Sequence, residues 1–318
     1  MNKTKNYNKI IFNIILIILI ILIIYLIILF IKYNYQINNF INTNNDNLIH
    51  NNNNDNNNTY TLPKIIWVFW DKEELPKNIS LIINNNKNKL GNEWIINVLN
   101  DNNIKNYLDI NTFPNNYINL EIQHKADYLR LKLLEKYGGI WMDASIIINS
   151  KDEFEKMFRD TLDDKIELTA FTLYEKDNLY KYHQYIENWF LIAPQNSNII
   201  KLWLKEFETA INMGFVEYKK YITEQLNVRL FWKIENSNCY LTMHTTLQVV
   251  LQNKLTNNYI PNLLLLKSED NMFKLYSDCT WNNDCIKKEF ENNIEIKNIP
   301  YIKLTSSGSG LDMEKYFS

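Results

Sequence analysis

Glycine is scarce in this sequence, with six residues among 318, and the pattern Gly-x-Gly-x-x-Gly is absent. That pattern lets the backbone approach a bound pyrophosphate, so its absence argues against a dinucleotide-binding Rossmann enzyme, and the scarcity of glycine also argues against a P-loop nucleotidase. The three cysteines are too few for a disulfide-dense scaffold, and their spacing matches no zinc site. Cys279 and Cys285 can pair if the domain lies in an oxidising compartment, which leaves Cys239 free.

The sequence also has no large excess of positive or of negative charge. Lys and Arg number 34 against 36 Asp and Glu, which gives a net charge of −2. No dense run of Lys or Arg occurs after the first sixty residues. A nucleic-acid partner usually requires a basic surface, so none is expected here.

A long apolar run opens the chain. In Ile10–Ile31 only Asn13 and Tyr25 are appreciably polar, and a helix of this length spans about 30 Å of hydrocarbon. A cleaved signal peptide is the alternative, but its apolar core has about 7–15 residues and is followed by small residues. The run therefore predicts an uncleaved anchor that contacts membrane lipid.

The flanking charges predict how this anchor is oriented. Lys3, Lys5 and Lys9 precede the run, whereas Lys32 alone follows closely. Positive flanks stay in the cytosol, so we expect a single-pass type II protein with its main domain on the non-cytosolic, lumenal side.

Four parts of the chain follow from these patterns. Residues 1–9 form a cytosolic tail, 10–31 the transmembrane signal-anchor, 32–60 a flexible stalk and 61–318 the main domain. Residues 41–58 of the stalk are mostly asparagine with almost no apolar content, so they cannot bury enough surface to offset the entropy of ordering.

Helix and strand patterns alternate in residues 61–318. Expected strands are short apolar runs at 65–70, 94–99, 167–173 and 188–193, and expected helices cover 79–90 and 198–213. The fold class is therefore α/β, with a mostly parallel sheet sandwiched between helices.

The most informative segment is His124–Ile148. Apolar residues at every third or fourth position predict a helix with one buried stripe, namely Ile122, Ala126, Leu129, Leu133 and Tyr137. Gly138 and Gly139 would end this helix. A short strand over 140–142 would then deliver Asp143 at its end.

This segment resembles the glycosyltransferase family that includes capsular polysaccharide synthesis proteins. Members share Asp-x-x-Arg on a helix, then Tyr-Gly-Gly, an apolar pair and an Asp-x-Asp motif. The matching positions here are Asp127, Arg130, Tyr137, Gly138, Gly139 and Asp143. Ser145 departs from the pattern, because it replaces the second aspartate.

The resemblance implies a GT-A-type fold and a donor site for a nucleotide sugar. Asp127 and Arg130 would hold the donor's sugar and phosphate, and Asp143 would be catalytic together with Asp127. Trp67 would stack on the nucleobase, although it could equally be a core residue, as expected for Trp70. Without the resemblance, the expected interpretation of Asp127 and Arg130 is a solvated ion pair, and that of Asp143 is a turn residue.

The resemblance also implies a divalent cation, Mn²⁺ or Mg²⁺, against the donor diphosphate. Asp143 would bind the cation directly and Ser145 through a water, although a hydroxyl is a poor substitute for a carboxylate. Lys303, near the C-terminus, would add a donor to the diphosphate; a disordered tail is the alternative for its segment.

Three further residues are candidates for the acceptor side. The segment containing Asn188 is similar to a strand that the family places near the acceptor, and Glu187 is its neighbour. His244 could contact phosphate or acceptor, although a lone histidine is more often structural.

We therefore expect a membrane-anchored hexosyltransferase that uses a UDP- or GDP-linked sugar and a glycan hydroxyl, with retention of configuration and assistance from a divalent metal. The alternative is a catalytically decayed transferase fold that acts as a membrane-tethered glycan- or nucleotide-binding protein. Ser145 is the residue that favours this alternative.

Overall fold

The computed structural model describes residues 60–173, 185–226, 228–255, 259–308 and 310–318. The predicted cytosolic tail, the anchor and all of the stalk except Tyr60 lie outside these residues. None of the described helices combines the length and apolarity that a membrane span needs. Tyr60–Ser318 is one compact unit. Tyr60 belongs to it, because its hydroxyl lies 2.9 Å and 2.8 Å from the carbonyl oxygens of Thr161 and Ile166.

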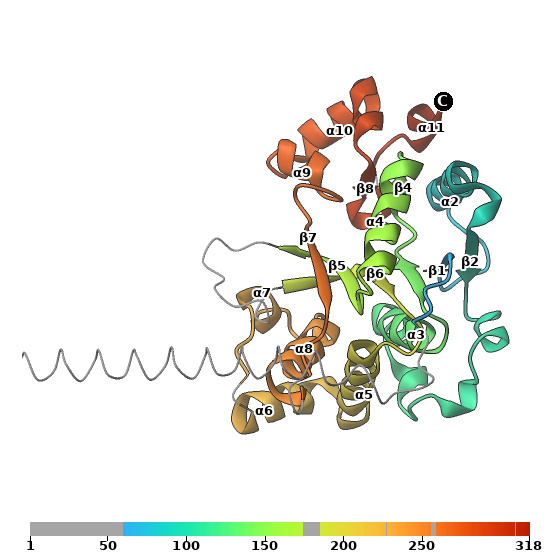
Figure 1. Ribbon diagram of the computed structural model, residues 1–318. Helices are drawn as coiled ribbons and strands as arrows, with labels where there is room; N and C mark the ends of the chain where they lie inside the picture. The colour runs from blue at the N-terminus through green and yellow to red at the C-terminus, as the bar shows by residue number, and fades with distance from the viewer. Residues whose placement is uncertain (1–59, 174–184, 227, 256–258, 309) are drawn as a thin grey trace, which may run out of the picture. The chain divides into compact units, whose positions relative to one another are not determined.

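A six-stranded sheet in the order β2-β1-β3-β6-β5-β7 forms the centre of this unit (Figure 1). Its strands are β1 (Ile65–Phe69), β2 (Ile95–Leu99), β3 (Gly139–Met142), β5 (Leu168–Leu173), β6 (Tyr185–Ala193) and β7 (Leu263–Lys267). Only β6 runs antiparallel to its neighbours, so the other five strands of this sheet share one direction. The predicted α/β class with a mostly parallel sheet is confirmed, but the sequence did not indicate the reversal of β6.

Helices cover both faces of the sheet because successive side chains of a strand point to opposite faces. In β1, Ile66 and Val68 face the core that contains α2 and α4, whereas Trp67 and Phe69 face α3, α5 and α8. The helices are α2 (Lys77–Leu90), α3 (Ile122–Tyr137), α4 (Lys151–Asp163), α5 (Asn198–Met213), α6 (Phe215–Gln225), α7 (Trp232–Glu235), α8 (Thr242–Val249), α9 (Lys274–Asp278), α10 (Asn283–Asn292) and α11 (Met313–Phe317).

A separate two-stranded antiparallel ladder joins β4 (Ile146–Ile148) to β8 (Tyr301–Lys303). The buried amide of Asn86 on α2 supports it, donating to the Ile146 carbonyl at 2.7 Å and accepting from the Ile148 N–H at 2.9 Å. Lys303 therefore belongs to a strand with fixed register, and the alternative of a disordered tail does not apply to it.

Helix α3 is buried on more than one side. The predicted single stripe is wrong at its start, since Ile122 is 43% exposed, whereas Asp127, Tyr128 and Arg130 are all buried. The cause is that α3 packs against the sheet and also against α5. Its polar residues lose solvent because they face other protein groups.

The double glycine after α3 permits a close approach of two backbones. The φ angles of Gly138 and Gly139 are +69° and +96°, a region that residues with a Cβ rarely adopt. A Cβ on Gly139 would lie 2.5 Å from the carbonyl oxygen of Ile65 in the neighbouring strand β1. The glycines thus turn the chain from α3 into β3 and let β3 start beside β1.

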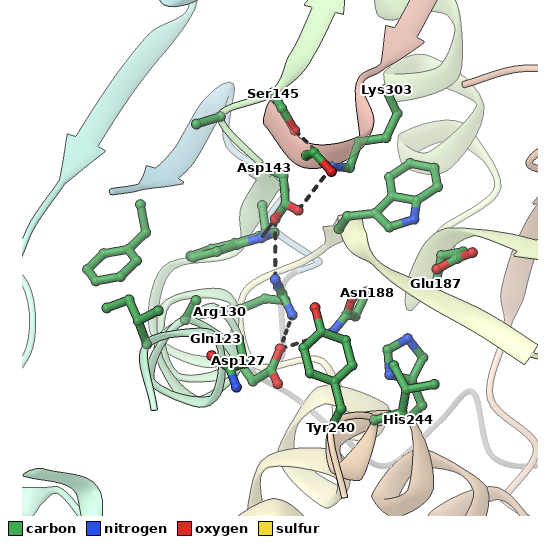
Figure 2. Close-up of a pocket in the computed structure, with 18 of the residues that line it drawn as sticks. Gln123, Asp127, Arg130, Asp143, Ser145, Glu187, Asn188, Tyr240, His244 and Lys303 are labelled. Atoms are coloured by element: carbon green, nitrogen blue, oxygen red, sulfur yellow. Dashed lines mark hydrogen bonds and ion pairs between the residues drawn. The ribbon is translucent and has the colours of Figure 1, made fainter. Parts of the chain in front are cut away.

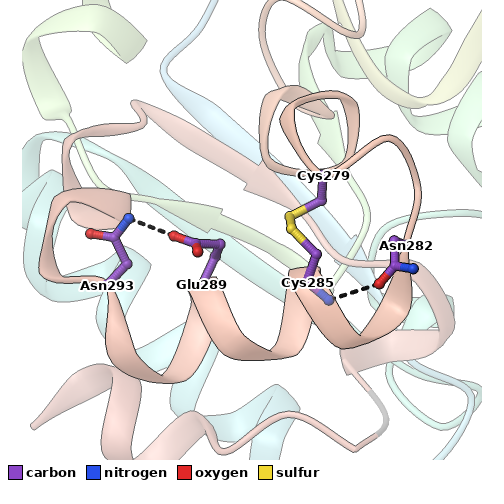
Figure 3. The surroundings of a disulfide bond; sticks show 5 residues. All are labelled: Cys279, Asn282, Cys285, Glu289 and Asn293. Carbon is purple, nitrogen blue, oxygen red and sulfur yellow. Dashed lines mark hydrogen bonds between the residues drawn. A yellow bond between two sulfur atoms is a disulfide. The ribbon is translucent and has the colours of Figure 1, made fainter.

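Cys279 and Cys285 form a disulfide between the end of α9 and the start of α10, with their Cα atoms 5.6 Å apart (Figure 3). The Asn282 side chain caps α10 by accepting from the Cys285 N–H at 2.9 Å. Cys239 is a free thiol. The sequence did not decide whether Cys279 and Cys285 pair, and the structure contains this disulfide.

We expect Gly139→Ala to destabilise the domain more than Gly91→Ala does. Both residues have positive φ, but a Cβ on Gly91 would meet nothing within 4 Å. Gly91→Ala should therefore lower the free energy of unfolding by about 1–3 kcal/mol from backbone strain alone. Gly139→Ala adds a clash with backbone. Urea unfolding followed by tryptophan fluorescence measures both; equal losses would show that the close approach to β1 is unimportant.

Candidate active site

A cavity of about 880 Å³ opens at the carboxyl ends of β1 and β3. Open α/β sheets commonly bind ligands at this end of their strands. Because β6 is antiparallel, its amino-terminal half, Tyr185 to Trp189, reaches the same end and supplies part of the wall. Further lining comes from α3, the turn between β3 and β4, the segment from α7 to α8, and Lys303.

Asp143 follows β3 directly and faces the cavity. Its backbone N–H donates to the Trp189 carbonyl at 2.9 Å, which extends the pairing of β3 with β6 by one residue. Its Oδ1 accepts from Trp141 Nε1 at 3.1 Å and from Arg130 Nη2 at 3.3 Å. The side chain is 32% exposed, so this carboxylate is both positioned and accessible.

Arg130 lies between two aspartates (Figure 2). Its Nη1 is 2.6 Å from Asp127 Oδ1, and its guanidinium carbon lies 4.8 Å from the ring centroid of Trp141. The Arg130 and Asp127 side chains are only 5% and 7% exposed. The alternative of a solvated helical ion pair is therefore wrong. Asn188 Nδ2 donates to the same Asp127 oxygen at 2.9 Å, which ties β6 to α3.

Lys303 approaches Asp143 from the opposite side. Its ammonium donates to Ser145 Oγ at 2.8 Å and to the Leu304 carbonyl at 3.2 Å, and it lies 3.5 Å from Asp143 Oδ2. Its side chain is 13% exposed. Lys303 thus contacts both residues that were predicted to hold a metal, Asp143 and Ser145.

The surroundings of Asp143 are a poor match for a divalent ion. One carboxylate and one hydroxyl are present, and cations flank them on two sides. The described residues contain no group of three or more His, Cys, Asp or Glu side chains placed to hold a metal. Binding of Mn²⁺ or Mg²⁺ therefore stays a prediction from the resemblance.

The three acceptor-side candidates all line the cavity. Burial raises the pKa of Glu187 to about 7, against an opposing effect of the nearby positive charge of Lys233. Burial lowers the pKa of His244 to about 3, so its imidazole is neutral at physiological pH. The His244 ring stacks on Tyr185 with centroids 4.8 Å apart, and neither of its nitrogens has a hydrogen-bond partner among the described residues.

Trp67 lies outside the cavity, contrary to its expected role against a nucleobase. It is 2% exposed, and its indole N–H donates to the Gly138 carbonyl at 3.0 Å. Trp67 lies too near the amino end of β1, because the residues of this segment that line the cavity are Phe69, Trp70 and Asp71. Trp70, expected in the core, is half-buried and contributes to the wall.

Sequence reasoning missed several residues of the site. Trp141 could have been found, since it lies two positions before Asp143 on the same strand face. Lys233 and Tyr240 also line the cavity, together with Tyr185. The segment carrying Lys233 and Tyr240 has no motif, so no sequence signal identified them.

A family model described as capsular polysaccharide synthesis protein matches residues 27–309. The O-glycosyltransferase braB of Annulohypoxylon truncatum is 26% identical over 162 residues, which are 46% of this chain and 38% of that protein. The chain thus matches less than half the length of this curated relative.

Two solved structures were also compared with the chain. The glycosyltransferase of PaToxG is 14% identical with a TM-score of 0.35, and covers 61% of this chain and 78% of its own. A glycosyltransferase involved in glycosylation of the major capsid of PBCV-1 is 8% identical with a TM-score of 0.37, covering 80% and 98%. These scores are too low to establish a shared fold.

Glu187 should make the domain less stable as pH rises. Its pKa is about 7 in the folded protein against 4.5 for an ordinary glutamate, so above pH 4.5 the unfolded chain loses the proton first. The contribution that Glu187 makes to the free energy of unfolding below pH 4.5 is therefore lost between about pH 4.5 and pH 7. The change in the free energy of unfolding caused by Glu187→Gln should therefore be about 3 kcal/mol more favourable to the folded state at pH 8 than at pH 4.5.

Urea unfolding at the two pH values measures this difference. The matched control is Glu217→Gln at an exposed position, which should give no pH-dependent gain. If Glu187→Gln gave an equal change in stability at pH 4.5 and pH 8, the carboxyl would not hold its proton in the folded state.

Proposed function

Because this chain belongs to the family of capsular polysaccharide synthesis proteins, we propose that it is a glycosyltransferase. It takes a hexosyl group from a UDP- or GDP-linked sugar and adds it to a hydroxyl of a glycan acceptor. One observation carries the proposal: Arg130 and Lys303 flank the accessible carboxylate of Asp143 at the wall of the cavity.

The charges at this wall suit a sugar diphosphate. A guanidinium donates paired hydrogen bonds to phosphate oxygens, and an ammonium adds a compact positive charge. The Asp143 carboxylate accepts hydrogen bonds from sugar hydroxyls. The cavity volume of about 880 Å³ lies within the range of pockets that enclose a small molecule.

Retention of configuration is part of the proposal. The bond between the anomeric carbon and the diphosphate oxygen breaks, and its electron pair stays on that oxygen. The acceptor oxygen attaches on the same face of the sugar, and its proton passes to the departing phosphate. Most of the rate then comes from stabilising the leaving group and from positioning donor and acceptor.

Asp127 has an indirect part in this scheme. Its Oδ1 is occupied by Arg130 and Asn188, and His124 Nδ1 lies 3.4 Å from its Oδ2. Asp127 therefore holds Arg130 in place more than it binds donor hydroxyls. The acceptor glycan enters beside Glu187 and His244. The neutral imidazole of His244 and, at mildly acidic pH, the protonated carboxyl of Glu187 exchange hydrogen bonds with hydroxyls.

The chain is further proposed to be a type II membrane protein, anchored through residues 10–31 with its catalytic domain on the lumenal side. The apolar run and its flanking lysines support the anchor. The Cys279–Cys285 disulfide supports the side of the membrane, because disulfides persist mainly in oxidising compartments.

We expect Asp143→Ala to abolish both sugar transfer and donor hydrolysis. The variant leaves Arg130 and Lys303 without their common anion, so turnover should fall at least about 100-fold. The assay screens a panel of UDP- and GDP-sugars, with product anomers identified by NMR. Asp160→Ala, at an exposed aspartate paired with Lys156, is the matched control and should keep normal turnover.

Near-normal turnover by Asp143→Ala would contradict the assignment. A wild-type protein that is stabilised thermally by UDP or GDP, yet turns over no donor, would instead support the catalytically decayed binding protein.

The disulfide should be present in protein isolated from its native membrane. Under denaturing, non-reducing conditions, an alkylating reagent should label Cys239 alone, and Cys279 and Cys285 should react only after reduction. Mass spectrometry of the labelled peptides measures this. Labelling of all three cysteines without reduction would argue against a lumenal catalytic domain.

A further inference from the structure

We propose that the ammonium of Lys303 takes the place of a divalent cation, so that this site neutralises the leaving diphosphate with Lys303 and Arg130 and works without metal. The inference rests on the proposed glycosyl transfer. It concerns the region where the resemblance implies Mn²⁺ or Mg²⁺ between Asp143 and Ser145.

The position of Lys303 is fixed by backbone pairing. In the β4–β8 ladder Lys303 lies opposite Ile146, the residue after Ser145. Hydrogen bonds hold the backbone on both sides of this pair: Leu304 N–H donates to the Ser145 carbonyl at 3.0 Å, and Lys303 N–H donates to the Met272 carbonyl at 2.9 Å. The lysine stem therefore starts from a rigid element beside the acidic motif.

The ammonium is surrounded by the kinds of oxygen that a divalent ion would take. Its contacts are the Ser145 hydroxyl at 2.8 Å, the Leu304 carbonyl at 3.2 Å and the Asp143 carboxylate at 3.5 Å. A lysine has three N–H donors and these are three acceptors. Figure 2 shows the Lys303 side chain reaching between Ser145 and Asp143.

Asp143 also has little capacity left for a metal. Its Oδ1 accepts from Trp141 and Arg130, and its Oδ2 faces Lys303. A dication placed there would displace these partners and stand close to two positive charges. Replacement of the motif's second aspartate by Ser145 fits this arrangement, because serine can accept a hydrogen bond from an ammonium without adding negative charge.

In the transfer step these two cations do the work assigned to a metal. As the bond from the anomeric carbon to the diphosphate breaks, negative charge accumulates on the oxygen that keeps the electron pair. Arg130 and Lys303 stabilise that charge electrostatically, and the Lys303 N–H group nearest Asp143, whose contact is the longest of the three at 3.5 Å, turns to the phosphate oxygen. The acceptor proton ends on the same phosphate, so no further acid is needed.

The test uses the full-length protein extracted in detergent, treated with EDTA and dialysed. Transfer, donor hydrolysis and calorimetric binding of UDP and GDP are then measured with and without added Mn²⁺ or Mg²⁺. We expect wild-type turnover and nucleotide affinity to change less than about twofold on chelation or on adding metal. Lys303→Ala should weaken nucleotide binding on the order of 10–100-fold, the loss of one charge-assisted hydrogen-bonding group.

Two variants act as controls. Lys303→Arg keeps the positive charge and should retain much of the nucleotide affinity. Lys274→Ala, at an exposed lysine paired with Asp278, should match the wild type. Circular dichroism verifies that each variant is folded.

The outcomes separate this inference from the proposed function. Turnover that is lost on chelation and restored by Mn²⁺ in the wild type overturns the inference and leaves the transferase assignment intact. Absence of turnover with every donor, with or without metal, contradicts the proposed function and the inference together. Metal-independent turnover that Lys303→Ala leaves unchanged would show that the lysine is not the replacing cation.

Discussion

The Arg130 guanidinium connects the elements on which the site depends. It bonds Asp127 on its own helix at 2.6 Å, reaches Asp143 at the end of β3 at 3.3 Å, and lies over the ring of Trp141. A buried charge is costly unless it is paired, so α3 and β3 must keep the spacing that allows both carboxylates to face it. The double glycine provides that spacing, because it lets the chain turn and lets β3 start against β1.

The cavity wall divides into a charged part and a part that carries two buried titratable groups beside Lys233. Asp143, Arg130 and Lys303 form the charged part, where the proposed reaction releases a diphosphate. Glu187 and His244 belong to the other, and burial raises the pKa of Glu187 and lowers that of His244, which favours the neutral form of each. Such a division separates the stabilisation of a leaving anion from the recognition of sugar hydroxyls.

Local patterns in the sequence predicted the helix, the glycines and the strand, and the family resemblance singled out Asp127, Arg130 and Asp143. The helix, the glycines, the strand and the positions of Asp127, Arg130 and Asp143 all lie within a short stretch, so their geometry follows from neighbouring residues. Trp67 was misplaced because strand alternation gives a side chain's face but not how far along the strand the cavity begins. The direction of β6 and the protonation of Glu187 arise from tertiary packing, which no local pattern reports.

The distance in sequence between Ser145 and Lys303, 158 residues, has a consequence for biosynthesis. Chains emerge from the ribosome amino-terminus first, at about 5–20 residues per second, so Asp143 and Arg130 are made long before β8. Until β8 pairs with β4, the site carries only one of the two cations proposed to face the phosphates. Competence for the proposed donor cleavage therefore waits for the synthesis of β8, and a chain that has not reached Lys303 holds an incomplete site.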